Sequence, residues 1–253
     1  MLFRSGRVAQ WGSAGRSIIL ARSRELVVQN HAAFCRLHPE LQDRTGVYCA
    51  GLGLKEYDKD IVFASIQSVS KKGDLFSPRK LVVIDEAYFG FGAETAVPLV
   101  AGYDNLVVTR SLSKSHGLAG LRVGYAIAQA ELIEGLNRVK DSFNSYPLDA
   151  VAQSAATAAI EDRQWLEAAS QSVRDVREVM STGLEAMGFE VLPSQANFIF
   201  IQHKTLHGKH IFDALRSRDI LGRRWDKQRI KNWLRVSVGT MAQAETLGPI
   251  PGG

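Results

Sequence analysis

The sequence has little cysteine and little proline. Its 253 residues include 2 cysteines and 7 prolines, which excludes a disulfide-stapled secreted domain and a proline-rich repeat. No apolar run approaches the roughly 18 residues of a membrane span, so no membrane partner is expected. Because the two cysteines form no CxxC pair, the expected location is the reducing cytoplasm. Hydrophobic residues make up 45% and charged residues 23%, which is typical of a globular chain with one large or two small domains.

Positive charge is unevenly distributed along the chain. Residues 1–80 hold 13 Lys and Arg against 7 Asp and Glu, whereas the remaining residues hold 18 against 19. A basic segment of this kind can face nucleic-acid phosphates, although a solvated surface has the same composition. The first 24 residues contain five Arg and no acid. This composition resembles a mitochondrial transit peptide, but we favour an open reading frame that begins inside a gene.

Apolar runs that alternate with helical patterns predict an α/β fold. The four consecutive apolar residues within 80–85 are typical of a parallel strand covered on both faces, and 105–109 and 123–128 are expected to be strands of the same kind. Further strands are expected at 17–21, 46–50, 61–65, 189–192, 197–202, 220–225 and 233–238, a loop at 73–79, and helices at 25–37, 130–139, 148–160, 164–187 and 208–218. The order predicts a mostly parallel sheet, followed by a smaller α/β lobe from about residue 160.

The richest local motif is SLSKSHGLAGLRVG at 111–124. It places three hydroxyls, Lys114 and Arg122 on a glycine-containing turn that follows an apolar strand. Hydroxyls beside an arginine suit the binding of a phosphate dianion. A lysine held next to them can form a Schiff base with an aldehyde cofactor. A solvated loop with a surface lysine is the alternative interpretation of the same spacing.

A second motif, DEAY at 85–88, ends the strand before it. Ligands in parallel α/β sheets bind outside the carboxyl ends of the strands. Asp85 and Lys114 both follow such ends, so we expect their side chains in one cavity, with Arg122 close to Ser111 and Ser113. A structural ion pair between the carboxylate and the lysine is the alternative.

Taken together, several segments closely resemble the fold-type I pyridoxal-phosphate aminotransferases, and the histidinol-phosphate aminotransferase family in particular. The segments are LVVIDEAYFGFGAETAVPLV, NLVVTRSLSKSHGLAGLRVGYAIA, SQANFIFI, DILGRRW and WLRVSVGT. The resemblance covers about residues 80–245, in the order and spacing of the family. It implies a large-domain segment at 80–160, a small C-terminal lobe at 161–253, and pyridoxal 5'-phosphate as the cofactor. It also implies an amino acid and a 2-oxo acid as substrates, and a homodimer.

The resemblance assigns roles by position. Lys114 would bind the cofactor through its amine and then move a proton between the substrate Cα and the cofactor. Asp85 would pair with the pyridinium nitrogen, and Tyr88 would donate a hydrogen bond to the phenolic oxygen of the ring. The remaining assignments are Ser111, Ser113 and Arg122 for the cofactor phosphate, Arg235 for the substrate carboxylate, and Arg223 for the substrate's own phosphate, with Arg224 next in line.

The segment before this region resembles a different family. ARSRELVVQN and HPELQDRTGVYCAGLGLKEYDKDIVFASIQSVSKK are similar to the first RecA-like lobe of superfamily-two helicases, over about residues 16–87. The strand LVVIDEAY fits both patterns, which implies a fusion at this strand, with residues 1–79 as a helicase-lobe fragment and nucleic acid as a possible partner. Arg16 stands where the phosphate loop needs lysine, and Tyr88 replaces the last residue of the helicase box. No ATP hydrolysis is therefore expected.

Parts of a complete aminotransferase have no counterpart in residues 1–79. These are the loop whose amides bind the phosphate, the aromatic residue that stacks on the ring, and an Asn-Pro turn. We therefore expect weak cofactor binding and impaired transamination. The alternatives are a nucleic-acid-binding helicase remnant without ATPase activity and an inert fusion that folds only in part.

Two histidine clusters have helical spacing that could place metal ligands on one face. They are His31, Cys35 and His38, and His203, His207 and His210. Ordinary surface or core histidines have the same spacing, and neither set has a supporting second cluster. No metal is therefore expected.

Overall fold

The computed structural model describes residues 16–21, 24–69, 72–76 and 80–247. The chain divides into two compact units. The first unit comprises Met1–Ala87, Thr95–Ser113 and Leu118–Ala156, and the second comprises Tyr88–Glu94, Lys114–Gly117 and Thr157–Gly253. Residues 1–15, which form most of the arginine-rich start, and the C-terminal residues 248–253 lie outside the described residues.

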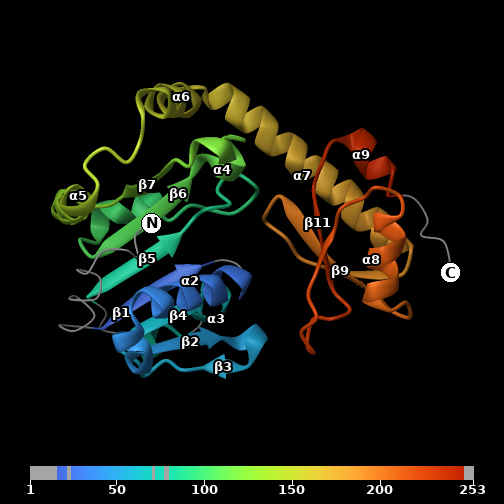
Figure 1. The fold of residues 1–253 in the computed structure, drawn as a ribbon, viewed down its shortest axis with the longest axis horizontal. Coiled ribbons are helices and arrows are strands. Elements are labelled where there is room, and N and C mark those ends of the chain that lie inside the picture. Colours follow the sequence, from blue (N-terminus) through green and yellow to red (C-terminus); the bar gives the residue numbers. More distant parts are fainter. Residues whose placement is uncertain (1–15, 22–23, 70–71, 77–79, 248–253) are drawn as a thin grey trace. The chain divides into compact units, whose positions relative to one another are not determined.

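A seven-stranded mixed sheet forms the first unit (Figure 1). Its strands run in the order β3 (Leu54–Lys55), β2 (Thr45–Cys49), β4 (Ile61–Ser65), β1 (Ser17–Ala21), β5 (Leu81–Asp85), β6 (Leu106–Ser111) and β7 (Gly124–Ile127). The five central strands are parallel, and β3 and β7 are antiparallel edge strands. This sheet confirms the predicted α/β fold with mostly parallel strands.

The direction of β7 corrects one prediction. Residues 123–128 were expected to form another parallel strand, but β7 runs antiparallel to β6. The chain reverses through one turn of helix, α4 (Leu112–Ser115), and the short 3-10 helix η6 (Ala119–Leu121). This connection holds no helix long enough to cross over the sheet, so the chain returns beside β6 in the opposite direction.

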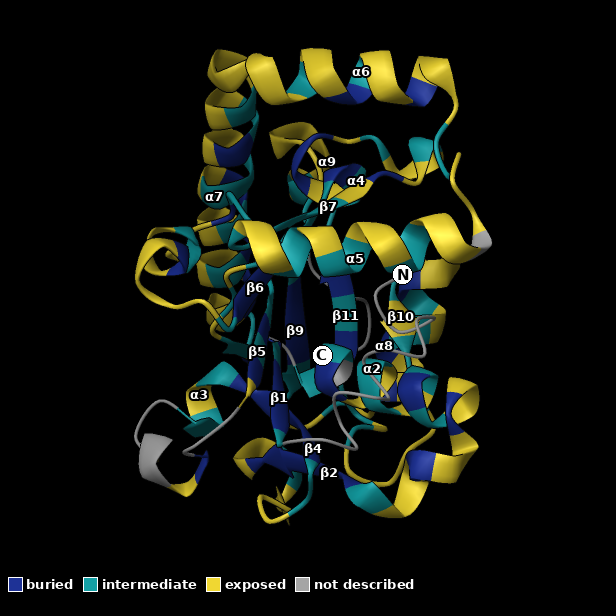
Figure 2. Ribbon diagram, turned by 90° about the vertical axis from the view of Figure 1, so that its left-hand side faces the viewer, coloured by how far each residue is buried: buried dark blue, intermediate teal, exposed yellow. Residues whose placement is uncertain are grey.

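Helices and loops cover both faces of this sheet. On one face, Ile19 and Val83 pack with Val27 and Phe34 of α2 (Arg24–Leu37), and α5 (Ala130–Phe143) packs on the same cluster through its apolar side. Figure 2 shows α5 with its outer side exposed. The opposite face carries Ile18, Val62 and Phe76 in one cluster and Val108 in another, beside η5 (Val97–Gly102). This double cover explains why the central strands are continuous apolar runs.

Short elements complete the first unit. They are η2 (Pro39–Arg44), η3 (Ala50–Leu52), α3 (Ile66–Val69) and η4 (Gly73–Phe76). The last of these is a 3-10 turn where a loop was predicted. The helix α6 (Ala150–Glu161) begins in the first unit and ends in the second. It starts two residues later than predicted.

The second unit combines a long helix with an antiparallel sheet. The sheet order is β10 (Arg223–Arg224), β11 (Leu234–Ser237), β9 (Phe198–His203) and β8 (Phe189–Leu192). The helix α7 (Arg163–Ala186) buries Val176, Met180 and Leu184 in one core cluster with residues of β9 and of α8 (Gly208–Arg216). These positions recur every four residues, as a helix packed on one face requires. The short helix α9 (Met241–Glu245) follows β11.

One strand of the second unit is shorter than predicted. A strand was expected at 220–225, but β10 holds only Arg223 and Arg224. Leu221 is 79% exposed, so the segment before β10 does not bury the apolar residues that suggested a strand. In the described ranges, no helix has the length and apolar character needed to cross a membrane.

Candidate functional site

Two neighbouring strands of the first unit end in the predicted site residues. β5 and β6 are parallel and adjacent, with Asp85 in register with Thr109. Ser111 lies two residues further along β6. Val83 and Val107 both belong to the cluster that packs on α2, and alternate residues of a strand face the same side. Asp85 and Ser111 therefore face the α2 side of the sheet at its carboxyl edge.

Two neutral donors hold the Asp85 carboxylate. Its Oδ1 accepts a hydrogen bond from the backbone N–H of Ala87 at 3.0 Å, and its Oδ2 accepts one from Asn30 Nδ2 at 3.4 Å. Burial raises the pKa of Asp85, and these two hydrogen bonds lower it in part. Since both donors are neutral, a cationic group placed against the carboxylate would stabilise its ionised form.

The turn after β6 holds the predicted phosphate-binding residues. Ser111 Oγ accepts a hydrogen bond from the backbone N–H of Ser113 at 3.1 Å. Leu112 N donates to Val123 O at 3.1 Å, which brings the start of β7 beside this turn. Arg122 adopts a left-handed backbone conformation with φ of 56°, and its Nη1 donates to Ala119 O at 2.9 Å. In the described part of the chain no hydrogen bond joins Arg122 to either serine, so their joint role stays a prediction.

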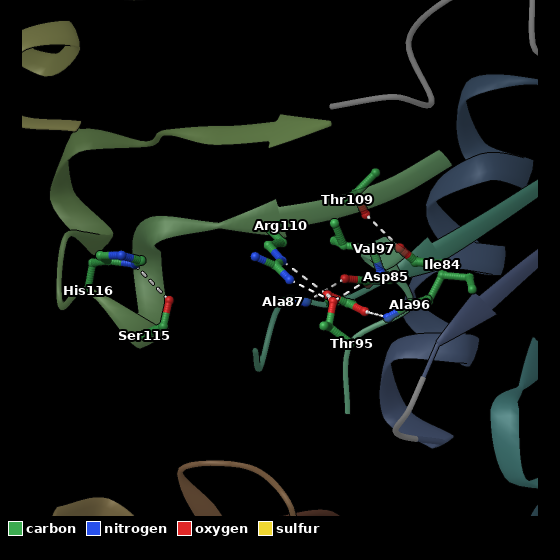
Figure 3. A network of polar contacts seen from close by, with 11 residues as sticks. Ile84, Asp85, Ala87, Thr95, Ala96, Val97, Thr109, Arg110, Ser115 and His116 are labelled. Atoms are coloured by element: carbon green, nitrogen blue, oxygen red, sulfur yellow. Dashed lines mark hydrogen bonds and ion pairs between the residues drawn. The ribbon is translucent and has the colours of Figure 1, made fainter. Parts of the chain in front are cut away.

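A buried polar network lies directly beside Asp85 in the sequence (Figure 3). Glu86, only 3% exposed, accepts hydrogen bonds from Ala96 N at 2.6 Å and Thr95 Oγ1 at 2.9 Å. Arg110 Nε forms an ion pair with Glu86 Oε2 at 3.0 Å, and its Nη2 donates to Thr95 Oγ1 at 2.7 Å. The network ties the ends of β5 and β6 together. Sequence reasoning missed it, although an acid placed next to a buried strand needs such a partner.

The second unit contains the predicted lysine and tyrosine. Lys114 is exposed at the end of α4, whereas Ser115 and His116 are buried. Ser115 Oγ lies 2.8 Å from His116 Nδ1. The ring of Tyr88 packs edge-on against Phe198, with 5.5 Å between the ring centroids. The exposed amine of Lys114 is therefore accessible to a small molecule.

Two arginines lie opposite each other in the second unit. Arg223 of β10 and Arg235 of β11 are register partners on antiparallel strands. The guanidinium of Arg223 lies 5.1 Å from the centroid of the Trp225 ring, and that of Arg235 lies 5.1 Å from the centroid of the Phe198 ring. Like charges directly opposite in a sheet are destabilising, and aromatic faces offset this only in part. A bound anion would stabilise the pair.

The neighbouring Arg224 differs from this pair. Its Nη2 forms an ion pair with Asp226 Oδ1 at 2.7 Å, and its Nε donates to Lys231 O at 2.8 Å. Among the described residues, neither Arg223 nor Arg235 forms an ion pair. The contacts therefore favour Arg223 over Arg224 as the residue free to meet an anion.

Individual contacts account for the histidine clusters. His31 Nε2 lies 3.4 Å from Cys35 Sγ, and burial lowers the pKa of His31. His38 Nδ1 lies 3.3 Å from Glu40 Oε1, and the His207 side chain caps the N-terminus of α8. Within the described ranges, no group of three or more His, Cys, Asp or Glu residues could hold a metal ion.

Comparison with known proteins identifies a family and several relatives. The model of the aminotransferase class I and II family matches residues 77–247. The histidinol-phosphate aminotransferase of Gluconacetobacter diazotrophicus is 54% identical over 170 residues, which are 67% of this chain and 48% of the relative. Histidinol-phosphate aminotransferase 2 of Thiobacillus denitrificans is 55% identical over 168 residues, which are 66% and 47% of the two chains. The chain thus spans about half the length of the curated relatives it matches.

Solved structures support the fold. The histidinol-phosphate aminotransferase of Sinorhizobium meliloti, solved in complex with pyridoxal-5'-phosphate, superposes with a TM-score of 0.67 at 17% identity. That match covers 94% of this chain and 72% of the other. The comparisons give no support to the helicase resemblance of residues 16–87, and the family match starts where most of that segment ends. Because the family match covers well over half of the chain, the protein belongs to the class I and II aminotransferases.

Proposed function

We propose that this chain binds pyridoxal 5'-phosphate and supports transamination of the histidinol-phosphate aminotransferase type. The observation that carries the proposal is the arrangement of β5 and β6. The two strands are parallel neighbours, so Asp85 and Ser111 face the same side of one sheet edge. Lys114 follows three residues after Ser111. Relatives that match about two thirds of this chain carry the histidinol-phosphate aminotransferase name.

The residues at this edge fit the cofactor. Asp85 is a largely buried carboxylate whose two hydrogen-bond donors are neutral. None of the ion pairs among the described residues includes it, so a protonated ring nitrogen would be a suitable partner. Ser111 Oγ accepts from Ser113 N, which leaves the hydroxyl hydrogen free to donate to a phosphate oxygen. Arg122 would add a charged donor for the same phosphate. Asp85 would therefore suit the ring nitrogen, and Ser111 and Arg122 would suit the phosphate.

Lys114, Asp85 and Tyr88 would each have a separate role in the reaction. When bound, the cofactor supplies an electron sink for the charge that develops at the substrate Cα. Lys114 would hold the cofactor through its amine, and Nζ would then accept and return the proton at the substrate Cα. Asp85 would keep a proton on the ring nitrogen. Tyr88 would donate a hydrogen bond to the phenolic oxygen.

The opposed arginines favour an anionic amino acid as substrate. Arg235 would bind the α-carboxylate through two parallel hydrogen bonds, since the planar guanidinium matches the carboxylate. Arg223 would meet a phosphate on the substrate side chain. A 2-oxo acid would serve as the second substrate and would use Arg235 for its own carboxylate.

We also propose that cofactor binding by this chain is weak. Residues 1–76 lie outside the family match, and no counterpart of the family's phosphate-binding loop or ring-stacking aromatic is evident there. Each charge-assisted hydrogen bond contributes about 1.5–3 kcal/mol, so the loss of two weakens binding by roughly a hundredfold or more. A homodimer and a cytoplasmic location remain part of the proposal, from the family resemblance and the low cysteine content.

Borohydride reduction tests the lysine assignment. The protein is incubated with pyridoxal 5'-phosphate, reduced, and mapped by peptide mass spectrometry. We expect the phosphopyridoxyl group on Lys114, loss of this label in Lys114→Ala, and an unchanged label in the control variant Lys140→Ala. Label spread evenly over surface lysines, and unchanged in Lys114→Ala, would refute the proposal.

A second candidate function concerns the N-terminal segment. Its support is the excess of basic residues in positions 1–80 together with the start of the family match at residue 77. On this interpretation the segment is a helicase-lobe remnant that binds nucleic acid without hydrolysing ATP. We expect no DNA-stimulated ATPase activity. A turnover that Asp85→Ala abolishes would instead make the DEAY motif a working nucleotide site.

A further inference from the structure

The helix α2 places a polar side chain beside Asp85. Val27 and Phe34, 1% and 0% exposed, pack in the cluster that covers this face of the sheet. Asn30 lies three residues after Val27 and four before Phe34, so it belongs to the same face of the helix. Asp85 follows Val83 by two residues and faces α2 for the same periodic reason. The contact between Asn30 and Asp85 thus follows from the two packing patterns.

The two oxygens of the Asp85 carboxylate have separate donors. Ala87 N binds Oδ1 at 3.0 Å, which fixes one end of the carboxylate against its own turn. Asn30 Nδ2 binds Oδ2 at 3.4 Å. A carboxylate offers about four lone-pair positions, so Oδ2 keeps room for a further donor.

The surroundings of Asp85 leave Asn30 with a distinct role. Thr109, the register partner of Asp85 on β6, is neutral. The adjacent Glu86 acts on Asp85 through its charge and raises the pKa of Asp85, but Glu86 is itself paired with Arg110. Asn30 and the Ala87 amide are the hydrogen bonds that favour the carboxylate. Loss of Asn30 would leave the Oδ2 end of this group without its donor.

We infer that Asn30 is a positioning residue for the cofactor nitrogen: it holds Asp85 Oδ2 and favours the ionised carboxylate that faces the ring. The inference rests on the proposed binding of pyridoxal 5'-phosphate. Asn30 lies before residue 77, outside the family match. A side chain from the N-terminal segment therefore serves a site whose other residues come from the aminotransferase region.

The first test uses the cofactor-free protein. Asp85 is titrated by carboxyl ¹³C NMR in the wild type, in Asn30→Leu, which removes the donor at similar volume, and in Gln29→Leu on the exposed side of the same helix. Asp85→Asn assigns the resonance. We expect the Asp85 pKa to move upward in Asn30→Leu and to stay in place in Gln29→Leu. An unchanged pKa in Asn30→Leu would overturn the inference.

The second test measures the affinity for pyridoxal 5'-phosphate by titration calorimetry. We expect Asn30→Leu to weaken binding by about three- to tenfold, the size of one net hydrogen bond. Asn30→Asp has the same shape and serves if Asn30→Leu fails to fold; its added negative charge should move the Asp85 pKa further upward. Equal or tighter binding in Asn30→Leu would mean that Asn30 competes for Oδ2, which overturns the inference. A wild type that binds no cofactor would refute the proposed function, while the cofactor-free titration still reports on the Asn30 contact.

Discussion

Asp85 and Glu86 are adjacent carboxylates at the carboxyl edge of the sheet, but they have different partners. Glu86 is nearly inaccessible, and donors from Thr95, Ala96 and Arg110 satisfy both of its oxygens. Asp85, one residue before it, faces α2 and has two neutral donors. Glu86 has its counter-charge in Arg110, whereas no side chain in the described part of the chain forms an ion pair with Asp85. The difference separates a carboxylate that holds two strands together from one that can receive a cation.

The three arginines of β10 and β11 also divide into one that is paired and two that are not part of an ion pair among the described residues. Arg224 is paired with Asp226 and also donates to a backbone carbonyl. Arg223 and Arg235 face each other across two strands, with aromatic rings as neighbours. The charge that is already paired stabilises local structure. The charges that oppose each other are the ones a ligand anion would stabilise.

The largest expected effect on stability comes from removing Glu86 from its network with Arg110 and Thr95. Glu86→Ala leaves Arg110 buried without its carboxylate and should lower the free energy of unfolding by about 3–5 kcal/mol. Urea unfolding measures the change. Glu134→Ala, which removes an exposed ion pair with Arg138, serves as the control and should change stability by less than about 1 kcal/mol. Similar losses in the two variants would contradict the assignment of Glu86 as a structural residue.

The next effect concerns the opposed arginines. Arg223→Gln should weaken the binding of histidinol phosphate by about tenfold or more, because one charge-assisted hydrogen bond contributes about 1.5–3 kcal/mol. Binding of histidinol, which lacks the phosphate, should not change. Isothermal titration calorimetry with both compounds makes the comparison, and Arg224→Gln is the matched control. Equal losses for both compounds would show that Arg223 does not meet the phosphate.

A smaller effect of opposite sign is expected at a buried hydroxyl of α7. Ser170 is 1% exposed, and its Oγ is the one buried side-chain polar atom in the described residues with no hydrogen-bond partner. Ser170→Ala should therefore raise the free energy of unfolding by about 1 kcal/mol. Ser181→Ala on the same helix removes a hydroxyl that donates to Arg177 O at 2.8 Å. That control should be neutral or destabilising, and a gain in both variants would point to helix propensity alone.

The smallest expected effect is the pH dependence of stability that Asp85 contributes. Burial raises the pKa of Asp85 in the folded chain, so the wild type loses stability relative to Asp85→Asn as the pH rises through that pKa. The hydrogen bonds from Ala87 and Asn30 offset part of this loss. The variant should gain on the wild type near neutral pH, and the difference should shrink as the pH falls below the ordinary value of 3.8. A stability difference that does not vary with pH would contradict the raised pKa of Asp85.

The apolar pattern predicted most strands and their parallel order, but not the direction of β7. The strands expected at 17–21, 61–65 and 189–192 have those bounds in the structure. The pattern of 123–128 resembles that of the parallel strands because Ala126 and Ile127 pack, partly buried, on clusters of opposite faces of the sheet, whereas β7 takes its direction from the short connection before it. Burial can be read from side-chain types. Direction depends on the path of the chain between strands.

The site was predictable where chemistry follows a strand end. Asp85 and Ser111 are the last residues of β5 and β6, and parallel pairing brings such ends to one edge. The partners of the two carboxylates were not predictable, because Asn30 and Asp85 are 55 residues apart and Arg110 and Glu86 are 24 apart. Only the packing of α2 and the alternation of side chains across the sheet decide which carboxylate meets the arginine and which meets the amide.

The left-handed backbone of Arg122 has a consequence for evolution. A residue other than glycine in this conformation costs roughly 1–2 kcal/mol, and Arg122 adopts it with φ of 56°. Selection for stability alone would favour glycine at position 122. Selection for anion binding would keep the guanidinium and accept the strained backbone. A library randomised at this one position and sorted separately for each property would show how far the two pressures diverge.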